Sequence, residues 1–64
     1  MNKPYTFVTT NQELNEWMSE SSQNTGYLEE AIALAREFDA DITLNNEPGF
    51  VVGHVHADGT YKLG

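Results

Sequence analysis

Apolar and charged side chains alternate with helical spacing over residues 25–39, TGYLEEAIALAREFD. The apolar positions are Tyr27, Leu28, Ala31, Ile32, Leu34, Ala35 and Phe38. Their spacing is typical of an amphipathic helix, and the alanine, leucine and glutamate content favours the same structure. Asn24 or Thr25 can accept a backbone N–H group at the start. The pattern predicts a helix that ends near residues 38–40, with one apolar face for a core and one largely anionic face outside.

A shorter apolar stripe predicts another helix, which precedes this one and begins at Asn11. The four residues TNQE at positions 10–13 have the form of a capping box, in which Thr10 and Glu13 satisfy each other's backbone N–H groups. The stripe that follows consists of Leu14, Trp17 and Met18. Helical spacing places all three on one face, so we expect Trp17 to belong to the core. The polar run over residues 19–26 is predicted to be the loop between the two helices.

Alternating β-branched and aromatic residues predict strands on both sides of the helices. The predicted strands cover residues 5–9, 41–45, 50–57 and 60–63. Pro48 and Gly49 suit the central positions of a type II turn. The chain is therefore predicted to be an α+β domain, with a three- or four-stranded, mainly antiparallel sheet and two helices packed on one face.

The dipeptide formed by Asp58 and Gly59 predicts a two-residue hairpin loop between the last two strands. Such a loop places His56 opposite Tyr61 and His54 opposite Leu63. Phe50 and Val52 would then share the face of these four residues. Both faces of this hairpin carry apolar residues, and we expect the face with Phe50 and Val52 to meet the helices.

Length and composition limit the kind of protein that the chain can be. Sixty-four residues predict one compact domain over positions 1–64, which we expect to be a monomer. The absence of cysteine excludes disulfides and thiolate metal sites, and it is consistent with the reducing cytoplasm of a host cell. The N-terminal residues lack the pattern of a leader peptide, and no apolar run is long enough to span a membrane.

Negative charge dominates the composition. Ten aspartate and glutamate residues stand against three lysine and arginine residues, which gives a formal net charge of −7 and a pI near 4.3. Direct binding to nucleic acid or to an anionic membrane is therefore disfavoured, whereas a basic protein surface is a favoured partner. The candidate partner-binding residues are Glu13, Glu16, Glu20, Glu29, Glu30, Glu37, Asp39 and Asp41.

The spacing of these carboxylates suggests how they could act. Duplex DNA carries one charge per roughly 3.4 Å along each strand, and two acidic helix faces can approach that density over a few phosphates. Such a surface could occupy a groove of lysine and arginine side chains that normally holds nucleic acid. The alternative is that the carboxylates simply form the solvated faces of two helices.

Catalytic chemistry has little support in the sequence. His54 and His56 point the same way on a strand and could share a cation, but a catalytic zinc site normally has a third protein ligand. Asp58 or Glu47 could supply it, yet nothing fixes their position. The chain also lacks a Gly-x-Ser-x-Gly motif and a glycine-rich phosphate loop. We therefore expect no enzymatic activity, no metal and no cofactor.

Three segments carry a resemblance to a known group of proteins: KPYTFVTTNQELNEW at the start, YLEEAIALAREFDAD in the middle and FVVGHVHADGTYKLG at the end. With its size, acidity and lack of cysteine, the chain resembles the anti-CRISPR proteins of phages and mobile elements, and within them an inhibitor of the type I-C system. The resemblance implies a CRISPR Cascade complex as the partner and exclusion of target DNA from it. The group has no diagnostic motif, so the resemblance assigns no role to any single residue.

The functional hypothesis from the sequence is therefore an acidic inhibitor of a nucleic-acid-binding host complex, with Cascade as the expected target. The alternative is a host regulatory or antitoxin-like module, which binds one basic protein without imitating DNA.

Overall fold

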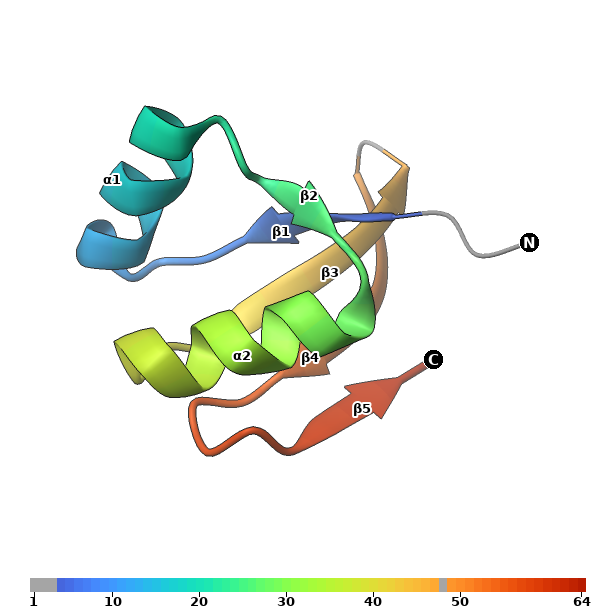
Figure 1. Cartoon of the computed structure of the whole chain (residues 1–64). Helices are drawn as coiled ribbons and strands as arrows, with labels where there is room; N and C mark the ends of the chain where they lie inside the picture. The colour runs from blue at the N-terminus through green and yellow to red at the C-terminus, as the bar shows by residue number, and fades with distance from the viewer. Residues whose placement is uncertain (1–3, 48) are drawn as a thin grey trace.

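The computed structural model of the chain describes residues 4–47 and 49–64 and contains one five-stranded antiparallel sheet with two helices (Figure 1). The elements in chain order are β1 (Tyr5–Val8), α1 (Gln12–Ser21), β2 (Thr25–Gly26), α2 (Leu28–Phe38), β3 (Ile42–Glu47), β4 (Phe50–Val55) and β5 (Tyr61–Leu63). The strand order is β2-β1-β3-β4-β5. The predicted α+β class is confirmed, although the sheet has more strands than the predicted three or four.

The core lies between the helices and the face of the sheet that they cover. Figure 1 shows both helices in front of the sheet, with α2 across β3 and β4 and α1 beside it near the end of β1. The buried apolar residues are Phe7, Leu14, Met18, Ala31, Ala35, Ala40, Ile42, Leu44 and Val55. Every helix and each of the strands β1, β3 and β4 contributes to this cluster, so the core joins the two layers.

Helix α1 begins at a different cap from the predicted one. The Asn11 side chain accepts a hydrogen bond from the backbone N–H of Leu14 at 2.9 Å, so Asn11 is the N-cap and the predicted Thr10 capping box is wrong. The Thr9 hydroxyl accepts from the Asn11 N–H and donates to the Asp41 carbonyl, which ties the helix start to the start of β3. The helix continues to Ser21, three residues into the predicted loop.

Helix α2 begins at Leu28 with Tyr27 as its N-cap, because Thr25 and Gly26 form strand β2. Thr25 pairs with Thr6 and Gly26 with Tyr5, so neither Asn24 nor Thr25 is the predicted cap. The Glu30 carboxylate instead reaches back to the Tyr27 N–H at 3.4 Å. On the buried side, the small residues Ala31 and Ala35 face the sheet. The larger apolar side chains of the stripe are only partly buried around them, namely Leu28, Ile32, Leu34 and Phe38.

The loop between β4 and β5 has three residues, not the predicted two. The Gly59 N–H donates to the His56 carbonyl at 2.9 Å, and the His56 N–H donates to the Thr60 carbonyl at 2.7 Å. Gly59 has a φ of +93°, as expected for the left-handed residue that follows a type I turn in such loops. One additional loop residue shifts the pairing of β5 with β4 by one residue relative to the prediction. A shift of one residue exchanges the side chains between the two faces of the sheet.

The pairing of β4 explains which residues reach the core. Val55 pairs with Tyr61 and His54 with Lys62, so the predicted pairs of the histidines are wrong. A bulge on β4 leaves Val52 without a partner on β3, because Leu44 pairs with Gly53 and Asn45 with Val51. Val55 and Gly53 therefore face the helices. The predicted core position of Phe50 is also wrong, since that side chain is 68% exposed, whereas Val52 is partly buried.

Candidate functional site

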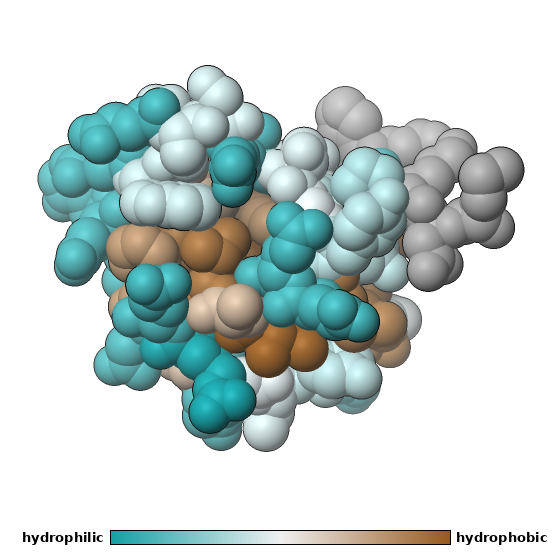
Figure 2. Space-filling model, viewed as in Figure 1, coloured by the Kyte–Doolittle hydropathy of each residue, from teal (hydrophilic) through white to brown (hydrophobic). Residues whose placement is uncertain are grey.

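The carboxylates predicted to bind a partner lie in the helical layer and at its ends. Glu13, Glu16 and Glu20 belong to α1, Glu29, Glu30 and Glu37 to α2, and Asp39 and Asp41 to the connection between α2 and β3. All of these residues are exposed. Figure 2 shows hydrophilic residues over both helices, with apolar surface visible between them and below α2. The predicted residues therefore belong to the two helices and to the connection that leads from α2 to β3.

Some of these carboxylates also have a structural task. Asp41 accepts the backbone N–H of Ala57 through its Oδ1 atom at 2.9 Å and so holds the loop between β4 and β5. Asp39 ends α2 in the left-handed conformation, with a φ of 52°. Glu30 caps the start of the same helix, as described above. A substitution at these three positions would therefore alter both charge and folding, unlike one at Glu16 or Glu20 on the exposed side of α1.

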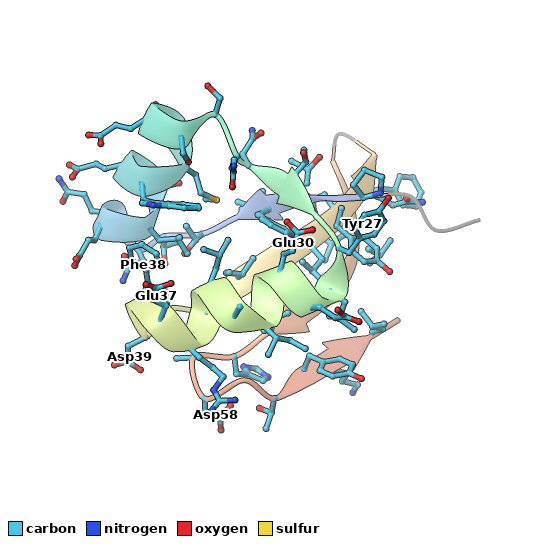
Figure 3. The ribbon with its side chains drawn as sticks, in the orientation of Figure 1. Tyr27, Glu30, Glu37, Phe38, Asp39 and Asp58 are labelled. Atoms are coloured by element: carbon cyan, nitrogen blue, oxygen red, sulfur yellow. The ribbon has the colours of Figure 1, made fainter. Side chains whose placement is uncertain are left out.

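Trp17 lies at the surface between the helices, so its predicted place in the core is wrong. Its side chain is 37% exposed, and its ring packs at an angle of 51° on that of Phe38 from α2, with 5.9 Å between the centroids. Glu13 and Glu20 stand four residues before and three after Trp17, and hence on the same side of α1. In Figure 3, Phe38 and Glu37 both point towards α1. We call Trp17, Phe38 and these three carboxylates the aromatic seam.

The other face of the sheet has a different character. Its side chains form a row across four strands, Val8, Thr43, His54 and Lys62. The next row contains Thr25, Thr6, Asn45 and Val51. Among the residues that the structure describes, no helix covers this open face and neither row contains a carboxylate. These two rows are thus neutral to weakly basic, whereas six of the ten acidic residues lie on the two helices.

The open face combines exposed apolar groups with polar ones. Val8 is 46% exposed and Val51 is 54% exposed. The Thr43 hydroxyl and the His54 Nδ1 atom lie 3.4 Å apart, which links β3 and β4 across this face. The Asn45 Oδ1 atom is buried and has no hydrogen-bond partner within the described part of the chain. This face could make a neutral protein contact.

Asp58 is an acidic residue outside the predicted partner-binding set, and its local hydrogen bonds shift the pKa of its carboxyl group. Its Oδ1 atom accepts from the Thr60 hydroxyl at 2.6 Å and from the Thr60 N–H at 2.9 Å. The bond from the Thr60 hydroxyl has the largest effect, and the bond from the Thr60 N–H adds to it. Both hold the pKa of the Asp58 carboxyl below its ordinary value, because they favour the charged form. Asp58 therefore stabilises the loop between β4 and β5, which lies on the other side of α2 from Phe38 (Figure 3).

An open depression of about 440 Å³ lies between α1 and the strand that follows it. Its lining consists of Phe7, Asn15, Met18, Ser19, Ser22 and Asn24. The set contains two hydroxyl groups but no histidine, lysine or carboxylate that could act as a base for them. It therefore has no nucleophilic arrangement of the kind that catalysis requires.

The two histidines lie near the end of β4 and directly after it. His54 lies on the open face, and His56 is at the start of the loop before β5. Within residues 4–47 and 49–64, no group of three or more histidine, aspartate or glutamate residues is arranged to hold a metal ion. Over the same residues, neither helix combines the length and the apolar character needed to cross a bilayer.

Comparison with known proteins adds no assignment to this geometry. No protein-family model, curated protein or solved structure gives a significant match to the chain.

Proposed function

We propose that the protein is an acidic inhibitor, which binds the cationic surface of a nucleic-acid-binding host complex and blocks the approach of target DNA. The observation that carries this proposal is the concentration of exposed carboxylates on the two helices. Exposed carboxylates occupy the helical layer, while the two described rows of the open sheet face hold none. Six of the ten acidic residues thus lie on the two helices, where a surface that replaces DNA could form.

The physical advantage of this arrangement lies in association more than in folding. Exposed carboxylates contribute little to stability, whereas complementary potentials raise the rate of encounter with a cationic groove. Lysine and arginine side chains that bind DNA phosphates displace the counterions condensed on the DNA. A carboxylate surface would pair with the same lysine and arginine side chains. The DNA-binding Cascade complex of a type I-C system is the target that the resemblance implies, and it is the first to test.

Two double variants of equal net charge test the proposal. Glu16→Gln with Glu20→Gln removes two negative charges from α1, and Val8→Lys with Val51→Lys adds two positive charges to the open face. Both change the formal net charge from −7 to −5, since −7 + 2 = −5. We expect the α1 variant to weaken binding to purified type I-C Cascade by about tenfold or more, and the sheet variant to have a much smaller effect.

The measurement is the dissociation constant of each variant at low and at high salt, together with competition by target DNA. The parent protein should bind more weakly as salt increases, and target DNA and the protein should exclude each other. If the α1 variant binds as tightly as the parent, or if DNA and the protein bind Cascade together, the inhibitor does not act by occupying the DNA site. Melting curves of both variants show whether each remains folded.

A second candidate function is a host regulatory or antitoxin-like module. The observation in its favour is the open face of the sheet, where Val8 and Val51 are about half exposed beside neutral polar side chains. Such a module would bind its partner mainly through apolar contact, with weak dependence on salt. The same pair of variants distinguishes the two functions, because here Val8→Lys with Val51→Lys would abolish binding and the α1 variant would not.

A further inference from the structure

The inference starts from an aromatic side chain that the fold leaves partly uncovered. Trp17 is the one tryptophan of the chain, and over a third of its surface is exposed although it packs on Phe38. A tryptophan with this much exposed surface and a rigid neighbour is suited to binding, because it offers a large contact area at a small cost in side-chain entropy. Phe38 limits the motion of the indole ring, so the exposed part of the ring is already in place.

The charges around Trp17 indicate what could bind there. Glu13 and Glu20 flank it on α1, and Glu37 lies beside Phe38 on α2, where both point towards α1 in Figure 3. The nearest described cations lie elsewhere. Arg36 packs over the loop between β4 and β5, since a Cβ atom at Gly59 would lie 2.8 Å from its Cδ atom. Lys62 lies on the open sheet face. The aromatic seam therefore combines the π surface of an indole ring with carboxylates, and this combination favours the binding of a positively charged group.

We propose that the aromatic seam receives an arginine side chain of the basic partner, stacked on the indole of Trp17 and hydrogen-bonded to a flanking carboxylate. A guanidinium group is planar and weakly hydrated, so it can stack on an aromatic face and still donate to carboxylates at its edge. An ammonium group can only act there as a hydrated point charge. The proposal rests on the proposed function and gives it a location and a preference for arginine over lysine.

Two peptides of equal charge test this preference directly. Octa-arginine and octa-lysine are titrated into the parent protein at low salt, with the emission of Trp17 and calorimetry as readouts. Both peptides should bind, because the helical side is acidic. We expect octa-arginine to bind about two to five times more tightly, which is the size of a cation–π contact at an exposed site. Octa-arginine should also change the emission of Trp17 more than octa-lysine does.

The variant Trp17→Leu separates stacking from the other differences between the two peptides. Leucine preserves an apolar contact with Phe38 and removes the π surface. In this variant, calorimetry should give nearly equal affinities for the two peptides. A preference for arginine that persists in folded Trp17→Leu, or equal affinities in the parent protein, would overturn the inference.

A second pair of variants gives the answer even if Trp17→Leu does not fold. Glu20→Gln and Glu29→Gln each remove one charge, but Glu20 flanks Trp17, whereas Glu29 lies on the side of α2 that carries Arg36. Glu20→Gln should reduce the arginine preference, and Glu29→Gln should leave it unchanged. Equal effects of the two variants would contradict the inference.

Failure of this inference is distinguishable from failure of the proposed function. Tight binding of both peptides without a preference would mean that charge alone attracts the partner, and the proposed function would stand. No binding of either peptide at low salt would overturn the inference and would also remove the support for an acidic inhibitor.

Discussion

Single carboxylates differ in whether they act within the chain or face the solvent. Asp58 acts within it, because its side chain accepts both the hydroxyl and the backbone N–H of Thr60. Glu16 and Glu20 lie on the exposed side of α1 and are the more suitable positions for testing partner binding. The pKa of the Asp58 carboxyl group can show its bonds to Thr60 experimentally.

The pKa of Asp58 should depend on the Thr60 hydroxyl, which is the largest cause of its shift below the ordinary value of 3.8. A lowered pKa in the folded state means that the unfolded state binds the proton more readily. The ionised Asp58 therefore stabilises the fold above its unfolded pKa, and this contribution is lost as the pH falls through the lower folded pKa. Thr60→Val should raise the pKa of Asp58 towards 3.8, as measured by NMR titration of the carboxyl carbon.

Thr43→Val is the matched control for that titration. The Thr43 hydroxyl lies near His54 on the open face and belongs to a different part of the sheet from Asp58. We expect the pKa of Asp58 in this variant to equal that of the parent. If Thr60→Val leaves that pKa unchanged as well, the hydroxyl bond does not cause the shift.

At the scale of the elements, the pairing of β5 with β4 requires a residue without a side chain at position 53 of β4. A Cβ atom at Gly53 would lie 2.6 Å from the Leu63 Cδ2 atom and 2.8 Å from the Lys62 carbonyl oxygen. The leucine can rotate away, but the carbonyl belongs to the backbone of β5. A side chain at this position therefore conflicts with the pairing of β4 and β5.

Gly53→Ala should destabilise the domain by about 1–3 kcal/mol, the usual range for overpacking. In a domain of this size, each kcal/mol lowers the melting temperature by roughly 4–8 °C. Amide hydrogen exchange should show the effect mainly in β5, while α1 retains its protection. Exchange rates in β5 equal to those of the parent would mean that the strand tolerates the added methyl group.

The sequence predicts the helices of this fold better than the pairing of its strands. Apolar periodicity locates α1 and α2 because each helix buries part of its apolar stripe against the core. Strand β2 was missed because Thr25 and Gly26 are a strand only through their pairing with β1. The loop register was also missed, since Asp58 and Gly59 fit both a two-residue turn and a three-residue turn with a bulge. The bulge at Val52 has no local signal, and it places Val51 on the same face of the sheet as His54.

In the candidate site too, features set by local periodicity are predictable, and features set by contacts between distant residues are not. Helical periodicity was sufficient to predict that the acidic residues of α1 and α2 are exposed, as the structure confirms. It could not show that Trp17 remains at the surface, because spacing alone places it beside Leu14 and Met18 on the apolar side. Its position depends on Phe38, a residue 21 positions later in the sequence whose place is fixed by the packing of α2 against α1.

At the scale of the whole molecule, charge and stability oppose each other. The net charge of −7 is concentrated in a domain with a radius of gyration of 10.5 Å, so the carboxylates repel one another more in the folded state than in the expanded chain. Salt should relieve this repulsion. The effect is opposite to the one expected on partner binding, which salt weakens.

We expect the melting temperature to rise between about 0.01 M and 1 M NaCl, because the screening length falls from about 30 Å to about 3 Å. Differential scanning calorimetry at neutral pH gives the measurement. The variant Glu16→Gln with Glu20→Gln is the control, and its melting temperature should rise less because it carries less charge. A parent melting temperature that is constant or falls with salt would show that repulsion does not limit stability.

The position of β1 inside the sheet, between β2 and β3, has a consequence for the order of folding. Strands β3, β4 and β5 are joined by short turns, whereas β1 pairs with β3 only after α1, β2 and α2 have been traversed, as in the pair Thr6 and Asn45. The entropy of closing a loop costs about 0.6 kcal/mol more for each doubling of its length. We therefore expect the two C-terminal hairpins to form early and β1 to dock late. The docking of Phe7 against Leu44 would then complete the core, and refolding would be slower than short turns alone would allow.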